Sequence, residues 1–215
     1  MKVIDLTHTV KESMPLYPGT KRPRLTPVAT YEKNFYRETE ICIYSHVGTH
    51  VDPPAHIAKE GKTLDSFSAD TFVGNALVID CRALKEGEQI TLKQLEKYGD
   101  KLKRADFLLF NTGWDKKWGT SDYFYGYPCI DDNVLQYIID GNYKGIGFDT
   151  ISLDPVSSST VERHKKLFAH SEIINIENLK NLDLCGDNIF LLCCLPLKYQ
   201  KSDGAPARAV AILDP

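Results

Sequence analysis

The feature that most limits the fold of this chain is a series of short, almost wholly apolar runs. ALVID, DFLLF and IFLLCCL contain consecutive Ala, Val, Ile, Leu, Phe and Cys without a polar residue at every second place. Such runs are typical of strands that are buried on both faces, as in a sheet covered by helices. In all, β-rich runs lie at 2–8, 40–48, 76–81, 106–113, 145–152, 172–179, 188–198 and 207–214.

Helical patterns occur between these runs, but only in the later part of the chain. Three segments are expected to be helices, at 91–99, 131–142 and 161–170. The first third instead consists of extended segments and loops with many prolines. We therefore predict a single α/β domain over residues 1–215, with a mixed sheet whose edge is formed by the N-terminal β segments.

Composition and charge exclude several classes of protein. The net charge of the 215 residues is −3, and Lys and Arg are scattered, which does not fit a nucleic-acid-binding surface. The longest apolar run, near 189–197, is far shorter than the roughly 20 residues that cross a bilayer. The N-terminus has no long apolar region of the signal-peptide type. The six cysteines form no CxxC pair and are expected to be reduced. These features predict a cytoplasmic protein that binds neither nucleic acid nor membranes.

The stretch HVGTHVDPPAH (46–56) gathers three of the six histidines and one aspartate. In an extended chain alternate residues share a face, so His46, His50 and Asp52 would point the same way. Two imidazoles and a carboxylate on one face suit Zn²⁺, Mn²⁺ or Fe²⁺. Four residues of flat strand span about 13 Å, at roughly 3.3 Å per residue, which is too far for one ion. The chain is therefore predicted to bend at Gly48.

His56 follows these candidate ligands after two prolines that stiffen the chain. An imidazole has an unperturbed pKa of about 6.5 and can exchange a proton at neutral pH. We therefore predict that His56 is a general acid and base beside the ion rather than a further ligand. No GxSxG sequence is present, so a serine nucleophile has no support.

Several stretches of the chain resemble the metal-dependent cyclase/formamidase family, whose members include bacterial kynurenine formamidase and isatin hydrolase. HVGTHVDPPAH is similar to the HxGTHxDxPxH signature of that family. The likeness extends through nearly the whole chain, in DLTHTVKESMPLYPGT (5–20), NTGWDKKWGTSDYF (111–124), GFDTISLDP (147–155) and DGAPARAVAIL (203–213).

This resemblance implies a swivelling β/β/α domain with a mixed sheet and a centre for one or two divalent ions, Zn²⁺ or Mn²⁺. The first ion would be held by His46, His50 and Asp52. Asp52 would bridge to a second ion, whose other ligands would be His164 and Glu177. The spacing of His164 and Glu177 is about one residue longer than is usual in the family, which leaves Glu172 as an alternative to Glu177.

The resemblance also implies a hydrolase of amide bonds with His56 as its acid and base. The expected reaction is that of an arylformamidase in tryptophan catabolism, in which N-formylkynurenine and water give kynurenine and formate. Hydrolysis of a cyclic amide such as isatin and a non-catalytic metal-binding scaffold are the alternatives. Tyr17 stands where family formamidases often carry Trp, and it is expected to contact a small aryl amide substrate. The resemblance further suggests a homodimer or a higher homo-oligomer.

Overall fold

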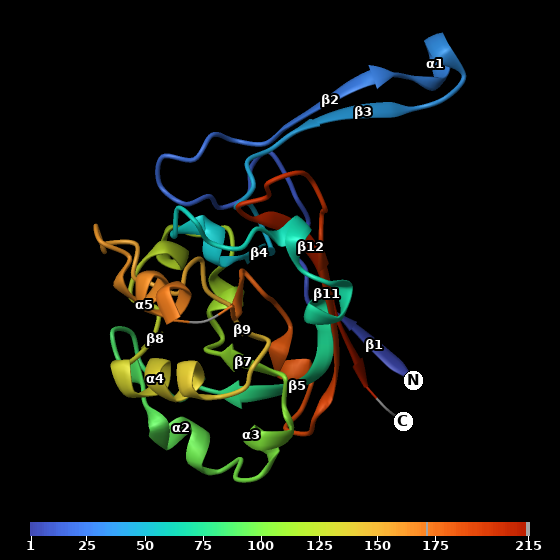
Figure 1. Cartoon of the computed structure of the whole chain (residues 1–215). Helices are drawn as coiled ribbons and strands as arrows, with labels where there is room; N and C mark the ends of the chain where they lie inside the picture. The colour runs from blue at the N-terminus through green and yellow to red at the C-terminus, as the bar shows by residue number, and fades with distance from the viewer. Residues whose placement is uncertain (171, 214–215) are drawn as a thin grey trace.

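In the part of the chain that the structure describes, residues 1–170 and 172–213, seven strands close into a barrel (Figure 1). The structure is a computed structural model. In order around the barrel, the strands are β12 (Ala205–Leu213), β11 (Phe190–Pro196), β5 (Val73–Asp80), β7 (Phe107–Asn111), β9 (Gly145–Phe148), β10 (Ile174–Glu177) and β4 (His50–Asp52). β4 also pairs with β12, which closes the ring. An eighth strand, β1 (Lys2–Asp5), pairs with β12 outside it.

The barrel is a mixed sheet, which confirms the predicted α/β class. Neighbouring strands from β5 through β7 and β9 to β10 are parallel, whereas the pairs that involve β11, β12 and β4 are antiparallel. The pairing of β12 with β4 that closes the barrel is short: Ala205 lies opposite Val51, and Pro206 lies opposite His50. The sequence analysis did not anticipate this closure. The finer assignment to the swivelling β/β/α domains stays a prediction.

The apolar runs of β5 and β7 are explained by burial on both faces of these parallel strands, but the same prediction is wrong for the antiparallel β11, where Leu191 and Leu195 are 40 % and 49 % exposed. In β7, Phe107 and Leu109 belong to a hydrophobic cluster that also contains alternate alanines of β12. Leu108 and Phe110 belong to a second cluster, which includes residues of every helix that covers the sheet. These helices are α2 (Leu92–Glu96), α3 (Lys101–Arg104), α4 (Asp132–Asp140) and α5 (Glu162–His170). Within residues 1–170 and 172–213, no helix is long and apolar enough to cross a membrane.

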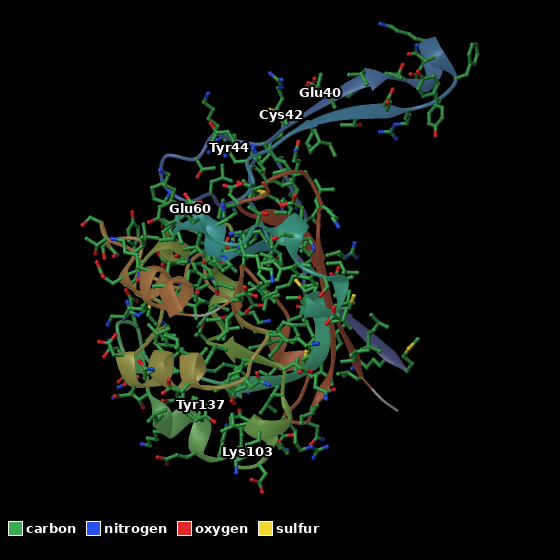
Figure 2. All side chains as sticks on the ribbon, viewed as in Figure 1. Glu40, Cys42, Tyr44, Glu60, Lys103 and Tyr137 are labelled. Carbon is green, nitrogen blue, oxygen red and sulfur yellow. The ribbon has the colours of Figure 1, made fainter. Side chains whose placement is uncertain are left out.

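A hairpin formed by an early segment of the chain projects from the barrel, on a different side from the N-terminus (Figure 1). It consists of β2 (Arg24–Ala29), α1 (Tyr31–Asn34) and β3 (Glu38–Cys42), and we call it the arm. Figure 2 shows its side chains standing away from the body of the protein. The predicted strand at 40–48 is therefore formed only in part, and in the arm. The N-terminal segments contribute only β1 to the outer end of the main sheet. A further small sheet joins β6 (Gln89–Ile90) and β8 (Cys129–Ile130).

Candidate metal centre

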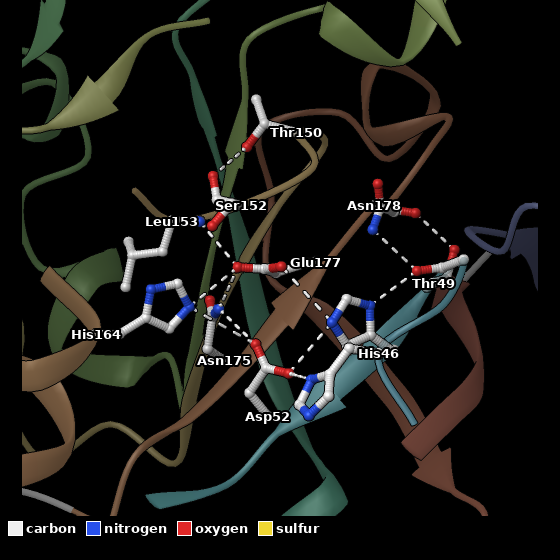
Figure 3. A network of polar contacts seen from close by, with 12 residues as sticks. His46, Thr49, Asp52, Thr150, Ser152, Leu153, His164, Asn175, Glu177 and Asn178 are labelled. Carbon is white, nitrogen blue, oxygen red and sulfur yellow. Dashed lines mark hydrogen bonds and ion pairs between the residues drawn. The ribbon is translucent and has the colours of Figure 1, made fainter. Parts of the chain in front are cut away.

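The antiparallel pair of β4 and β10 puts candidate ligands on one face of the sheet. In its register Glu177 lies opposite His50, and Asn175 lies opposite Asp52. Side chains alternate along a strand, so all four of these side chains point to the same side. His164 reaches the same place from α5, and Figure 3 shows the resulting network of polar contacts.

His46 joins this cluster because the chain turns sharply at Gly48. Gly48 has a φ of +63°, in the left-handed region that glycine adopts without steric cost. The imidazole centroids of His46 and His50 lie only 5.3 Å apart. The predicted bend is thus confirmed. The extended stretch is shorter than expected, because β4 begins only at His50.

The five predicted ligands form two groups that share Asp52: one with His46 and His50, the other with His164 and Glu177. In each group one ligand atom of every residue lies within 4.8 Å of the others. His46 Nδ1 and His50 Nε2 lie 2.6 and 3.2 Å from Asp52 Oδ1. His164 Nε2 lies 3.2 Å from Glu177 Oε1 and 3.8 Å from Asp52 Oδ2. Imidazole nitrogens and carboxylate oxygens that converge in this way fit a transition-metal ion or Zn²⁺.

The alternative carboxylate, Glu172, lies outside this cluster. It is exposed, and Lys62 Nζ contacts its Oε2 at 2.8 Å. Glu177 is only 5 % exposed and contributes to the second group of candidate ligands. The geometry therefore favours Glu177 over Glu172.

Buried carboxylates control the charge of the two innermost histidines. Burial works against a charged His50, but Asp52 and Glu177 outweigh it and raise the pKa of His50 to about 9. Burial likewise opposes a charged His164, whereas hydrogen bonds with Asp154, Asp52 and Glu177 raise its pKa well above the usual value. The pKa of Asp52 lies well below its usual range, because the neighbouring histidines outweigh the effect of burial. The cluster thus places positively charged histidines beside negatively charged carboxylates in the interior. A divalent ion bound there would change this distribution of charge.

His56 lies beside the cluster without belonging to either group of ligands. It ends the 3₁₀ turn Pro54–His56, and its ring centroid is 3.9 Å from that of His46 and 5.7 Å from that of His164. Burial lowers the pKa of His56, and the nearby imidazoles of His46 and His164 lower it further against the opposite effect of Asp52. His56 thus lies next to the candidate ligands, and its role in proton transfer stays a prediction.

A cavity of about 650 Å³ opens over the cluster. His46, His50, His56, His164 and Glu177 all line it. The rest of its wall is largely apolar and includes Leu16, Tyr17, Tyr44, Ile57, Ile151 and Val161. An apolar cavity with a few convergent polar groups is the usual form of a small-molecule site.

The chain matches the sequence model of the cyclase family, described as "Putative cyclase", over residues 4–155, which is more than half of its length. It belongs to the cyclase family. A protein of Methanocaldococcus jannaschii without an assigned function is 34 % identical over 99 % of this chain and 100 % of its own length. The kynurenine formamidase of Bacillus thuringiensis is 29 % identical over 96 % of this chain and 95 % of that protein.

Solved structures agree with this family membership. Isatin hydrolase A from Labrenzia aggregata superimposes with a TM-score of 0.87 at 25 % identity, covering 98 % of this chain and 93 % of that one. The relatives thus include named hydrolases, and a further solved structure, 25 % identical with a TM-score of 0.80, is described as a potential metal-dependent hydrolase with cyclase activity. This chain contains a largely buried His, Asp and Glu cluster that fits a metal ion.

Two side chains that orient this cyclase-family cluster were missed by the sequence analysis. The Asp154 carboxylate lies 2.7 Å from His164 Nδ1 and accepts the backbone N–H of both Arg163 and His164. It thereby turns Nε2 toward the cluster, as carboxylates commonly do for metal-binding histidines. The Asn175 amide donates to Asp52 Oδ2 at 3.1 Å and to Glu177 Oε1 at 2.9 Å. These two oxygens lie 3.8 and 3.2 Å from His164 Nε2.

Proposed function

We propose that this protein is a metal-dependent arylformamidase, which hydrolyses N-formylkynurenine to kynurenine and formate. The observation that carries the proposal is the position of His56: its imidazole lies outside the ligand groups, yet its ring is tilted against that of His46 at 3.9 Å in the same apolar-walled cavity. A structural metal site would need the ligands alone. Kynurenine formamidase activity among full-length relatives gives further support.

In this proposal His46, His50 and Asp52 hold a first ion. Asp52 would also belong to a second site completed by His164 and Glu177, with Zn²⁺ as the expected ion and Mn²⁺ as an alternative. When bound, such an ion supplies Lewis acidity, which activates water and polarises the amide carbonyl.

His56 would move the proton that the reaction requires. It accepts a proton from the attacking water as the new carbon–oxygen bond forms at the formyl carbon. It then gives this proton to the amide nitrogen as the carbon–nitrogen bond breaks, and the arylamine and formic acid leave, the acid releasing its proton to solvent as formate. A neutral imidazole at rest suits this order, since it must first act as a base.

Tyr17 and the apolar residues of the cavity would hold the aryl ring. Tyr17 packs against an aromatic cluster and also lines the cavity, so one part of its side chain is fixed while another meets the ligand. An aromatic side chain provides a large contact area for an aryl substrate.

Hydrolysis of a cyclic amide such as isatin is a second candidate, favoured by the structural likeness to isatin hydrolase A. The decisive experiment is a hydrolysis panel on the Zn²⁺- or Mn²⁺-reconstituted protein with N-formylkynurenine, formanilide and isatin. Turnover of the formamides supports the first candidate, and turnover of isatin alone supports the second. A protein that binds metal but turns over none of them would instead be a scaffold.

We expect a Gly204→Ala substitution to disturb the first ion site. Gly204 lies against the His46 ring, and an added Cβ would lie 2.6 Å from Nε2 and 2.8 Å from Nδ1. The ring must move, so we predict at least a roughly tenfold loss of metal affinity. Moving a ligand is expected to weaken metal binding about as much as removing a hydrogen-bond partner that orients the ligand. Elemental analysis after dialysis against a chelator measures the loss, and circular dichroism checks the fold. Unchanged metal retention in a folded variant would contradict the ligand role of His46.

We also predict that metal affinity rises with pH up to about 9. His50 must be neutral to bind an ion, and its surroundings raise its pKa to about 9. Below that value each ion displaces at least one proton, so the affinity should rise by about tenfold per pH unit. Competition with a chromophoric chelator between pH 6.5 and 9 measures this slope. A flat profile over that interval would exclude a protonated His50 in the metal-free protein.

We further propose that residues 1–215 form one domain in the cytoplasm and that two or more copies associate through the arm. Phe35 at its tip is 90 % exposed, and Tyr31 and Ile41 are each 61 % exposed. Apolar groups held on a projecting hairpin favour burial by another copy. Light scattering should show that Phe35→Glu converts a homodimer into a monomer. Tyr125→Glu is the control, because Tyr125 is also 61 % exposed but lies outside the arm. A wild-type monomer would refute the proposal.

A further inference from the structure

Asp203 lines the cavity above the metal cluster and is half open to solvent, with 53 % of its side chain exposed. Its Oδ1 accepts the Tyr199 hydroxyl at 2.9 Å. Its Oδ2 accepts the Ser45 hydroxyl at 3.2 Å and lies 3.3 Å from His46 Nε2. Two hydroxyls and an imidazole thus fix the direction of this carboxylate, and its exposed half remains free for a ligand that enters the cavity.

No side chain with a permanent positive charge compensates Asp203 from within the described wall of the cavity, and a metal ion at the cluster would lie on the other side of the His46 ring. Among the described residues that line it, none is Lys or Arg. The other lining carboxylate, Glu177, is turned to His50 and His164 within the cluster. Asp203 is therefore the carboxylate that remains for a substituent of the substrate. An anionic substituent beside Asp203 would meet a like charge with no Lys or Arg side chain of the cavity to offset it, and such like-charge contacts are costly.

Aromatic rings add to this preference. Tyr17 and Tyr44 both line the cavity, and Tyr44 directly precedes Ser45, which contacts Asp203. The face of an aromatic ring is electron-rich and attracts ammonium groups within about 6 Å of its centroid. A carboxylate and tyrosine rings that line the same cavity are the arrangement expected of a site that recognises an organic cation.

We propose that Asp203 is a specificity-determining residue that binds an ammonium group on the substrate, so that the preferred substrate class is an aryl amide with a basic substituent. His46 joins the two sites, since its Nδ1 faces Asp52 while its Nε2 faces Asp203. The ammonium would thus bind one imidazole ring away from the reacting amide. The inference rests on the proposed hydrolase function. N-formylkynurenine carries an α-ammonium group that would meet Asp203, and its α-carboxylate would have to point away from Asp203.

Three formanilides of similar size test this proposal on the Zn²⁺-reconstituted protein. They carry an aminomethyl, a hydroxymethyl or a carboxylate group in the meta position. We expect kcat/KM to be highest for the aminomethyl compound and lowest for the carboxylate. In Asp203→Asn the ratio of aminomethyl to hydroxymethyl values should fall about tenfold, the usual size of a lost charge-assisted hydrogen bond. The ratio cancels any effect of the substitution on His46 and the metal. Glu60→Gln is the matched control, because it removes one exposed negative charge outside the cavity.

An unchanged ratio in Asp203→Asn, or a preference for the carboxylate compound, would overturn the inference even if hydrolysis is fast. Absence of hydrolysis for all three compounds would instead refute the proposed function. In that case calorimetry with the amine product, 3-aminobenzylamine, and with 3-aminobenzyl alcohol decides about Asp203 alone. If the wild type binds the diamine more tightly than the alcohol and Asp203→Asn loses this difference, the role of Asp203 as the ammonium-binding residue is supported. Equal binding of both compounds to the wild type contradicts that role.

Discussion

Replacing His56 with Ala is expected to abolish most hydrolysis while leaving the metal in place. General acid–base catalysis by one side chain contributes about 10²–10⁴-fold, so kcat for N-formylkynurenine should fall by a factor in this range. His56 belongs to neither ligand group, and its removal should leave the bound metal per chain unchanged. Steady-state kinetics and elemental analysis of the same sample measure the two effects.

Added imidazole provides the control for this variant. It can enter the space left by the missing ring and should restore part of the activity of His56→Ala. Wild-type turnover by His56→Ala would contradict the proton-transfer role. Loss of metal together with activity would show that His56 acts as a ligand.

The second large effect is expected for Asp52→Asn, because Asp52 is shared by both ligand groups. Asn keeps the shape of the side chain but removes the charge that balances two buried histidines. We predict a loss of affinity of at least about 100-fold for the metal, more than is typical for a residue that only supports a ligand. Hydrolysis should fall to the background rate.

Metal titration of the stripped variant, followed by a competing chelator, measures this loss. Asp122→Asn serves as the control, since Asp122 is an exposed aspartate remote from the cluster. Two ions bound with wild-type affinity to Asp52→Asn would refute the shared site.

Local patterns in the sequence were sufficient to predict one half of the candidate site. The alternation of ligand-type residues and the distance argument together predicted the bend at Gly48, and the φ of +63° confirms it. The apolar runs of β5 and β7 predicted strands buried on both faces, and the two core clusters confirm this, whereas the prediction is wrong for the run in β11, where Leu191 and Leu195 are exposed. Such features depend on neighbours in the chain, which is why the sequence alone reveals them.

The other half of the site depends on contacts between distant segments. His164 and Glu177 were expected only from the family resemblance. Asn175 could not be foreseen, because its amide meets Asp52 across 123 positions of the chain, through the register of β4 with β10. The role of Gly204 is equally non-local, since it depends on the pairing of β12 with β4 that closes the barrel. No periodicity in the sequence specifies which strand closes such a ring.

The most direct test of the proposed centre is the release of formate from N-formylkynurenine as Zn²⁺ is titrated into the metal-stripped protein. We predict no release without metal and a rise that saturates at one or two ions per chain, with no rise for Asp52→Asn. Formate release by the stripped protein at the rate of the loaded one would contradict a metal-dependent hydrolase built on these residues.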